Sequence, residues 1–240
     1  MVDQTRFITA RRAYEFDPDD LRLTVLIAAG VNQQIVEFFS FQVAQIATPM
    51  PMFGPVPNTL PPGLVFDFGS TQTEEILPAP LRFLHFEPQR IVIDVAGPSS
   101  AIDWTYARLL DMSAELRAPD GSPAIGEPRR VLDYSEITAR FSFGLEKLIS
   151  EPLRVAAQRT FAGDEEEQKV VPVSVKFRAA KPSDRISPGE IGAMGTSRGQ
   201  MIEVRRDTRL EDGIYLSATN LPTDEHLAWI EVLDNQLRES

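Results

Sequence analysis

The stretch LRFLHFEPQRIVIDVAGPSSAIDWTYARLLDMSAELR, residues 81–117, contains two predicted strands followed by one predicted helix. Residues 81–86 and 90–96 are rich in apolar and β-branched side chains and flank the turn EPQ at 87–89, which is typical of a hairpin. From Ser100 to Arg117 the apolar residues recur every three or four positions, which predicts an amphipathic helix. A hairpin that precedes a helix favours an α+β fold over alternating parallel βαβ units.

The predicted helix at residues 100–117 has both a cap signal and an apolar face. The residues GPSS at 97–100 precede it, and Asp103 stands three positions after Ser100, which predicts a box-like cap. We expect the apolar stripe to pack on a sheet. It comprises Ile102, Tyr106, Leu109, Ser113 and Leu116.

The order of strand, strand and helix recurs later in the chain. Residues 201–206 and 214–219 predict a hairpin, and residues 224–238 predict a helix that Thr223 caps. The helical pattern at residues 145–160 contains Pro152, so we expect two short helices or one bent helix there. Further strands are predicted at residues 7–16, 21–29, 35–46, 64–69, 136–143 and 170–179, with 21–29 and 35–46 forming one long hairpin.

Together these elements predict one α+β domain over residues 1–240, with a β-rich part at 1–97 and a mixed part at 98–240. Ten of the 14 phenylalanines lie within the first 86 residues, and aromatic side chains are enriched in strands. We therefore expect a mainly antiparallel, aromatic-rich sheet that is built from hairpins and covered by three or four helices.

The composition is that of a folded, acidic protein. The chain has 35 acidic and 24 basic side chains, a net charge of −11 and no cysteine. Binding to nucleic acid or to an anionic membrane depends on cationic groups, so neither partner is expected. The longest apolar run, residues 24–31, is far shorter than the roughly 20 residues of a membrane-spanning helix, and the first residues do not resemble a secretory signal. These features predict a soluble, cytoplasmic protein.

Histidine is the first side chain to consider for catalysis or metal binding. The chain has no cysteine and its two histidines, His85 and His226, are far apart in sequence, so we predict no metal site and no cofactor. His85 lies on the predicted strand face of Leu81 and Phe83, which indicates a satisfied or half-buried histidine. No G-x-S-x-G motif supports a serine nucleophile.

Carboxylates on the predicted strands are a second possibility for catalysis. Asp67 stands between two phenylalanines, Asp94 stands between two β-branched residues, and Glu74 and Glu75 begin the loop after Asp67. Paired acids in an apolar setting can have separated pKa values that suit acid/base chemistry. However, alternation places Asp94 opposite the apolar face of its strand, so we expect it to face water in an ordinary half-solvated sheet.

A glycine-rich loop at residues 187–199 is the best candidate for anion binding. Its glycines allow backbone N–H groups to converge, and its hydroxyl and guanidinium groups suit phosphate or carboxylate. The alternative is a surface connection of ordinary composition. The anion-binding candidates are Gly192, Gly195, Thr196, Ser197 and Arg198.

A proline-rich loop at residues 48–63 is the candidate for partner binding. Six prolines in this segment exclude a regular strand or helix, yet it carries several apolar side chains. Either the loop is a preformed recognition arm, or it folds back and caps the phenylalanine-rich core. The side chains concerned are Met50, Met52, Phe53, Val56 and Leu60.

The sequence therefore favours a non-catalytic binding or assembly protein that acts through protein–protein contacts. A protein partner or self-association into a homo-oligomer is expected, and an enzymatic activity is not. The alternative is a small-molecule or phosphoester enzyme that uses the strand carboxylates and the glycine-rich anion loop.

Overall fold

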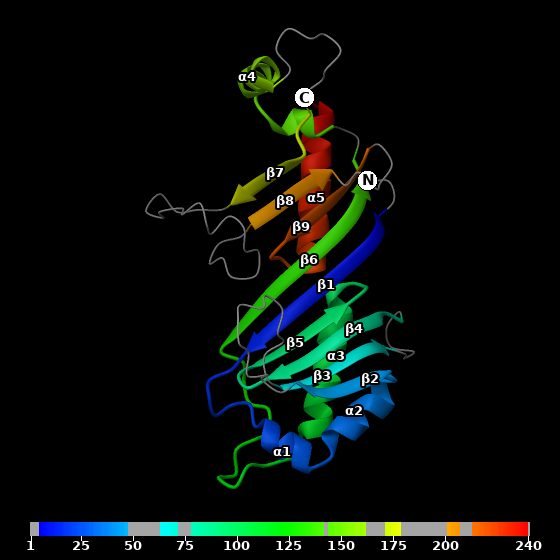
Figure 1. The fold of residues 1–240 in the computed structure, drawn as a ribbon, viewed down its shortest axis with the longest axis vertical. Coiled ribbons are helices and arrows are strands. Elements are labelled where there is room, and N and C mark those ends of the chain that lie inside the picture. Colours follow the sequence, from blue (N-terminus) through cyan, green and yellow to red (C-terminus); the bar gives the residue numbers. More distant parts are fainter. Residues whose placement is uncertain are drawn as a thin grey trace, which may run out of the picture. The chain divides into compact units, whose positions relative to one another are not determined.

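The computed structural model describes residues 5–47, 63–71, 78–141, 144–161, 171–178, 201–206 and 213–239. The chain divides into an N-terminal unit, Thr9–Asp133, and a C-terminal unit, in which Met1–Ile8 joins Tyr134–Ser240. Strands β1 (Thr5–Glu15) and β6 (Arg130–Arg140) contribute residues to both units (Figure 1). The single domain over residues 1–240 stays a prediction.

The N-terminal unit is a five-stranded antiparallel sheet with three helices. The strand order is β2-β3-β4-β5-β1, and every neighbouring pair is antiparallel. The predicted hairpin at residues 81–96 is confirmed as β4 and β5. The bounds are β2 (Val43–Ala47), β3 (Gly63–Ser70), β4 (Pro80–Glu87), β5 (Arg90–Val95), α1 (Leu23–Ala28), α2 (Val31–Phe39) and α3 (Ser99–Ser113).

The predicted hairpin of residues 21–29 and 35–46 is wrong. These residues form α1 and α2, and only the end of the second run continues into a strand, β2. The apolar residues Val31, Ile35 and Phe39 are spaced by four and are all buried, which is the period of a helix face. Gly30, with φ of 70°, separates the two helices. The spacing of the buried apolar residues, and not the β-branched composition of the segment, therefore corresponds to the observed structure.

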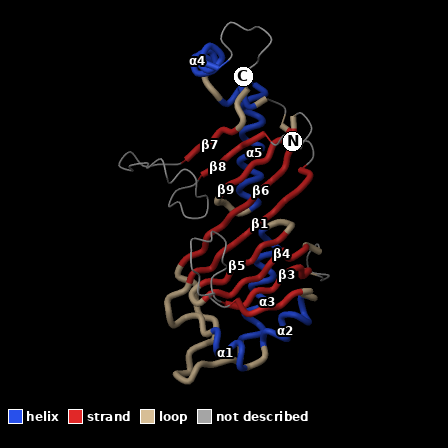
Figure 2. Tube along the Cα trace, in the orientation of Figure 1, coloured by secondary structure: helices blue, strands red, loops and turns tan. Residues whose placement is uncertain are grey.

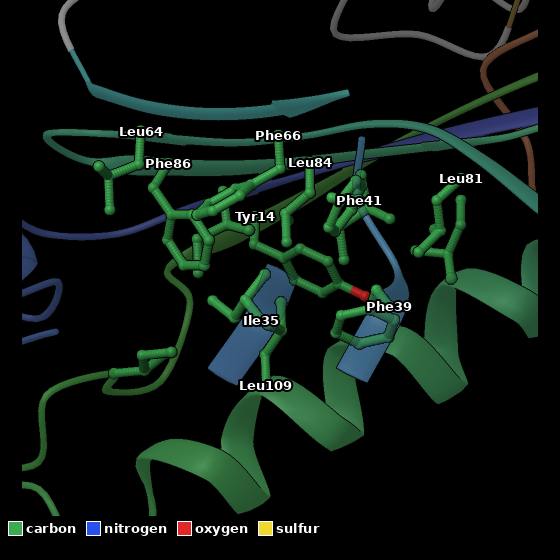
Figure 3. Packing of buried hydrophobic residues seen from close by; sticks show 14 of the residues in the cluster. Tyr14, Ile35, Phe39, Phe41, Leu64, Phe66, Leu81, Leu84, Phe86 and Leu109 are labelled. Carbon is green, nitrogen blue, oxygen red and sulfur yellow. The ribbon is translucent and has the colours of Figure 1, made fainter. Parts of the chain in front are cut away.

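The hydrophobic core of the N-terminal unit lies between the sheet and helices α2 and α3. Helix α3 packs on β5, and α2 packs on α3 and β3 (Figure 2). Aromatic rings from both layers meet there: Phe39 contacts Phe41, Phe41 contacts Phe66, and Phe66 contacts Phe86 (Figure 3). The expected aromatic-rich sheet is thus confirmed for this unit.

Strand β3 departs from simple alternation at Phe68. The sequence predicts that Phe68 shares a face with Leu64 and Phe66, but its φ is 58° and its side chain is 63% exposed. The next residue, Gly69, lies so close to the Phe41 ring that a Cβ atom would be 2.6 Å from it. The positive φ turns the Phe68 side chain away from the core, so the strand alternation expected over residues 64–69 is wrong at Phe68.

Helix α3 confirms the predicted helix and its buried stripe, but the predicted cap is wrong. Pro98 occupies the N-cap position, and no side chain caps the helix. Asp103, which was expected to complete the cap, forms an ion pair with Arg12 instead. The carboxylate of Asp103 therefore pairs with the buried Arg12 guanidinium and is not used in a capping box.

The C-terminal unit is an antiparallel sheet with one long helix along one face. The strand order is β6-β9-β8-β7, and Figure 1 shows α5 running along the sheet. Its core is formed by side chains of β6, β8, β9 and α5, such as Ile137, Val204, Tyr215 and Ile230. The bounds are η1 (Leu145–Leu148, a 3-10 helix), α4 (Glu151–Phe161), β7 (Ser174–Arg178), β8 (Met201–Arg206), β9 (Ile214–Thr219) and α5 (Thr223–Glu239).

Most predictions for the C-terminal unit are confirmed. The hairpin at residues 201–219 and the last helix are present, and the pattern at 145–160 divides into two helices near Pro152. Strand alternation over residues 170–179 predicts that Val171, Val173, Val175 and Phe177 face inward. This prediction is wrong at Val173 and Phe177, because both side chains are exposed. Pro172 predicts that this strand lies at an edge of the sheet or that Pro172 is among its first residues, and β7 is the last strand in the order.

The α+β class is confirmed, and the pairings within both units are antiparallel. The described residues form five α-helices and one 3-10 helix, while the expectation that three or four helices cover the sheet stays a prediction. None of the described helices is long and apolar enough to span a membrane.

The packing of α3 on the sheet gives a direct test. Leu109 is buried in the core while its neighbour Leu110 is exposed. We expect Leu109→Ala to lower the free energy of unfolding by about 2–5 kcal/mol, because the substitution removes buried contacts and leaves a cavity. Leu110→Ala should change it by less than about 0.5 kcal/mol. Urea unfolding measures both, and equal losses in the two variants would overturn the orientation of α3.

Candidate functional site

The two loops that the sequence singles out lie outside the described residues. This holds for the anion-binding candidates Gly192, Gly195, Thr196, Ser197 and Arg198, for the partner-binding candidates Met50, Met52, Phe53, Val56 and Leu60, and for Glu74 and Glu75. Both loop hypotheses stay predictions. The other candidate residues lie in the described part of the chain, which also contains clusters that the sequence did not indicate.

The strand register gathers Asp67, His85 and Asp94 on one face of the N-terminal sheet. Asp67 pairs with Phe83, and Phe83 pairs with Asp94, so the Cα atoms of the two aspartates lie about 10 Å apart on either side of Phe83. His85 follows two residues after Phe83 and therefore points to the same side. We call this side, opposite the helices, the second face of the sheet. Leu81, predicted to share a face with His85, lies in the helix-side core instead, because the register shifts between Leu81 and Phe83.

Asp94 is buried on the second face, contrary to the expectation that it faces water. Its exposed fraction is 1%. The Arg11 side chain donates a hydrogen bond of 2.7 Å to Oδ2, and Arg82 Nε lies 3.1 Å from Oδ1. The Arg11 guanidinium also lies 5.1 Å from the centroid of the Phe83 ring. The two cations offset the cost of burying the carboxylate, which is why a charged residue is tolerated at this position.

His85 is also buried on the second face and lies beside Glu87. His85 Nδ1 is 3.5 Å from Glu87 Oε1, and Arg90 donates two hydrogen bonds of 2.9 Å to the same carboxylate. These bonds from Arg90 to Glu87 raise the pKa of Arg90 above its usual value. A Cβ at Gly63 would be 3.2 Å from His85 Nε2, so the backbone of β3 lies close to the ring. His85 is only 3% exposed, so it is more deeply buried than the predicted half-buried histidine.

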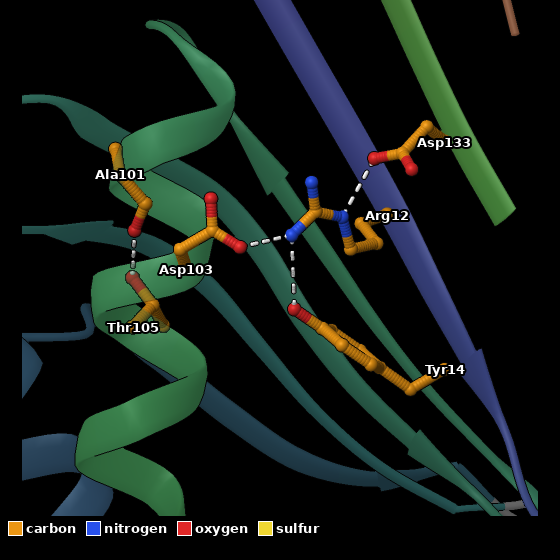
Figure 4. Close-up of polar contacts among 6 residues, drawn as sticks. All are labelled: Arg12, Tyr14, Ala101, Asp103, Thr105 and Asp133. Carbon is orange, nitrogen blue, oxygen red and sulfur yellow. Dashed lines mark hydrogen bonds and ion pairs between the residues drawn. The ribbon is translucent and has the colours of Figure 1, made fainter. Parts of the chain in front are cut away.

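A second polar cluster surrounds Arg12 on the helix side of the same sheet. Arg12 Nε donates a hydrogen bond of 2.6 Å to Asp133 Oδ1, and the guanidinium also forms an ion pair with Asp103 (Figure 4). Another N–H lies 3.4 Å from the Tyr14 hydroxyl. Burial opposes the charge on Arg12, but the hydrogen bonds to Tyr14 and Asp133 outweigh it and raise the Arg12 pKa.

Two stacked tyrosines complete this cluster. The Tyr14 and Tyr106 rings lie 3.8 Å apart at an interplanar angle of 9°. Burial raises the pKa of Tyr14, and it raises the pKa of Tyr106 to about 12, with a further contribution from the charge that Tyr14 carries once it is ionised. Both phenols are therefore neutral at physiological pH, and the cluster binds β1, α3 and the start of β6 together.

A third polar network, in the C-terminal unit, is centred on His226 of α5. His226 Nδ1 lies 2.7 Å from Ser135 Oγ, and Nε2 lies 2.8 Å from Ser217 Oγ. Because the Ser135 hydroxyl donates to the Leu221 carbonyl, it accepts from Nδ1–H, and Nε2 accepts from Ser217. Burial lowers the pKa of His226 to about 4, so the ring is neutral. All three side chains are fully buried, which indicates a structural role.

Helices α2 and α3 present an aromatic and cationic surface cluster of Phe38, Trp104 and Arg108. Phe38 is 49% exposed and stacks on Trp104, with ring centroids 5.9 Å apart. The Arg108 guanidinium lies 5.5 Å from the Trp104 centroid, and Phe39 contacts Trp104 edge to face from the core side. We call Phe38, Trp104 and Arg108 the α2–α3 surface.

The α2–α3 surface was not predicted from the sequence. The spacing of Trp104 and Arg108, four residues apart on a predicted helix, was an available signal. Phe38 was assigned to a strand, so its position beside Trp104 could not be inferred.

Comparisons of the chain with protein-family models, with curated proteins and with solved structures find no match. Functional conclusions therefore rest on the geometry of these clusters. Within the described ranges, no group of three or more histidine, aspartate or glutamate side chains could hold a metal ion.

The buried His226 predicts a specific pH dependence of stability. Its pKa in the folded protein is about 4, below the 6.5 of the unfolded chain, so the unfolded state binds more protons between these values. Neutral His226 makes its full contribution to the free energy of unfolding above pH 6.5. This contribution, up to about 3 kcal/mol, is lost as the pH falls toward 4.

The comparison with His226→Gln isolates this effect, since all other titrating groups are shared. We expect the stability difference between wild type and variant, from urea unfolding, to shrink as the pH falls from 7 to about 4. A difference that stays constant over this range would show that His226 titrates normally in the folded protein.

Proposed function

We propose that this chain is a non-catalytic binding or assembly protein that acts through protein–protein contacts, with the α2–α3 surface as a contact region. The observation that carries the proposal is the half-exposed stack of Phe38 on Trp104, with Arg108 above the same indole ring. Tryptophan, aromatic residues and arginine are the side chains that contribute most to binding energy at protein interfaces.

The α2–α3 surface is preorganised for binding. Phe39 is fully buried and supports Trp104 from the core side, while the Arg108 side chain also forms an ion pair of 2.9 Å with Asp111. Side chains that are already held in place lose little conformational entropy when a partner binds. This preorganisation supports a role in recognition, which exposure of an apolar side chain alone would not.

The proposal predicts that Phe38→Ser removes partner contacts without unfolding the protein. The measurement is chemical cross-linking of the tagged chain in an extract of its source, with quantitative mass spectrometry of the attached proteins. We expect attachment of the main partner to fall by at least about 30-fold, the loss that corresponds to an interface hot spot.

Ile27→Ser is the matched control, because Ile27 is a similarly exposed apolar residue on α1. The control should retain the partner, and both variants should keep their melting temperature within a few degrees. Unchanged attachment in folded Phe38→Ser would exclude the α2–α3 surface as the contact region.

A second candidate function is a small-molecule or phosphoester enzyme. The grouping of Asp67, His85 and Asp94 on the second face of the sheet favours it, with partly exposed arginines nearby. Against it, Asp94 is held between Arg11 and Arg82, so its oxygens already have partners within the sheet. We therefore rank this function second.

Hydrolysis of bis-p-nitrophenyl phosphate tests the enzyme alternative. If it is correct, the wild-type protein releases p-nitrophenol and His85→Gln loses most of this activity. Arg129→Gln, which alters an exposed ion pair with Asp17, is the control and should retain it. A wild-type rate equal to the buffer rate would remove this candidate.

A further inference from the structure

We propose that strand β7 pairs antiparallel with β7 of a second copy of this chain, so that the sheet of the C-terminal unit continues into a two-fold dimer. β7 is the last strand in the order β6-β9-β8-β7, and among the described residues only β8 pairs with it. The inference rests on the proposed assembly function by naming a second copy as partner, but it uses none of the residues of the α2–α3 surface.

The backbone direction of β7 defines which groups face the outer edge. Arg206 N donates to the Val173 carbonyl, with a distance of 2.9 Å. In an antiparallel ladder alternate residues bond to the same neighbour, so the backbone groups of Val173, Val175 and Phe177 point toward β8. The N–H and C=O groups of Ser174 and Lys176 therefore point to the outer edge.

These outward groups are self-complementary in one register. If Val175 lies on the two-fold axis, Ser174 is opposite Lys176 of the partner subunit, and Lys176 is opposite Ser174 of the partner subunit. Each pair then exchanges two backbone hydrogen bonds, so the outward N–H and C=O groups of Ser174 and Lys176 are satisfied in both copies. A two-fold interface requires such a self-complementary patch.

The side chains of β7 support the same register on the α5 side of the sheet. Val173 is 67% exposed and Phe177 is 41% exposed, although Phe177 also contacts Trp229 of α5 at a ring distance of 6.3 Å. In the proposed register Val173 lies opposite Phe177 of the partner subunit, and the two copies of Val175 are adjacent. The exposed apolar row of each copy thus covers that of the other.

Charge on the other side of β7 is compatible with this pairing. A lysine on an edge strand normally discourages edge-to-edge association. Here Lys176 Nζ lies 3.5 Å from Glu203 Oε2 on β8, and the Ser174 hydroxyl donates to Glu203 Oε1 at 2.6 Å. Lys176 is therefore drawn over its own sheet and paired with Glu203.

Cysteine cross-linking tests the register, because the natural chain has no cysteine. In Val175→Cys the two Cα atoms would be about 4.5 Å apart, within the range of a disulfide. In Val173→Cys they would be about 13 Å apart, although this position is more exposed. We expect mild oxidation to convert most of Val175→Cys to a disulfide-linked dimer and to leave Val173→Cys monomeric.

Equal cross-linking of the two variants, or none in Val175→Cys, would overturn the proposal. Phe38→Ser, introduced into Val175→Cys, should leave the cross-linking unchanged. This double variant shows whether β7 pairing occurs independently of the α2–α3 surface, so the two proposals can fail separately.

A second experiment uses the cysteine-free protein. Ser174→Pro removes one outward N–H without affecting the ladder to β8, while Ser174→Ala keeps that N–H and removes the hydroxyl bond to Glu203. In sedimentation velocity we expect a weak, concentration-dependent dimer for wild type and Ser174→Ala, since the contact is small, and a monomer for Ser174→Pro. A wild-type monomer throughout the concentration series, or a Ser174→Pro dimer, would contradict the inference.

Discussion

The burial of the Arg12 charge is the constraint on which the arrangement of the N-terminal unit depends. A guanidinium in this position must be neutralised, because an unpaired buried charge costs several kilocalories per mole. Its two carboxylates come from α3 and from the start of β6, so the pairing sets the position of both elements relative to β1. Apolar contacts are not directional, whereas the ion pair of Arg12 with Asp103 and the stack of Tyr14 on Tyr106 fix α3 at defined positions on β1.

The sequence predicts those parts of the fold in which local pattern and tertiary environment agree. The hairpins at residues 81–96 and 201–219 have both the period and the turn residues of their elements, and the helices α3 and α5 have the apolar period of a helix, although the predicted cap of α3 is wrong. Helices α1 and α2 were missed because β-branched and aromatic residues favour strands locally, while the burial of Val31, Ile35 and Phe39 against the sheet favours a helix. Such a tertiary effect is not visible in composition.

The candidate sites were less predictable than the fold, because they depend on partners that are distant in sequence. The face of Asp94 was predicted correctly, but its burial was not, since that depends on Arg11, 83 residues away, and on Arg82 at a register shift. The pairing of His226 with Ser135 likewise joins residues 91 positions apart. Alternation along a strand indicates a direction for a side chain and does not indicate what lies in that direction.

The continuity of β4, β5 and α3 along the chain has a consequence for the order of folding. These elements follow one another between Pro80 and Ser113, so their mutual contacts close only short loops, and α3 packs directly on β5. The hydrogen bond between Arg12 and Asp133 spans 121 residues and closes at a much larger entropic cost. We therefore expect the hairpin and its helix to form a folding nucleus, and the buried ion pairs of β1 to form afterwards on a surface that already exists.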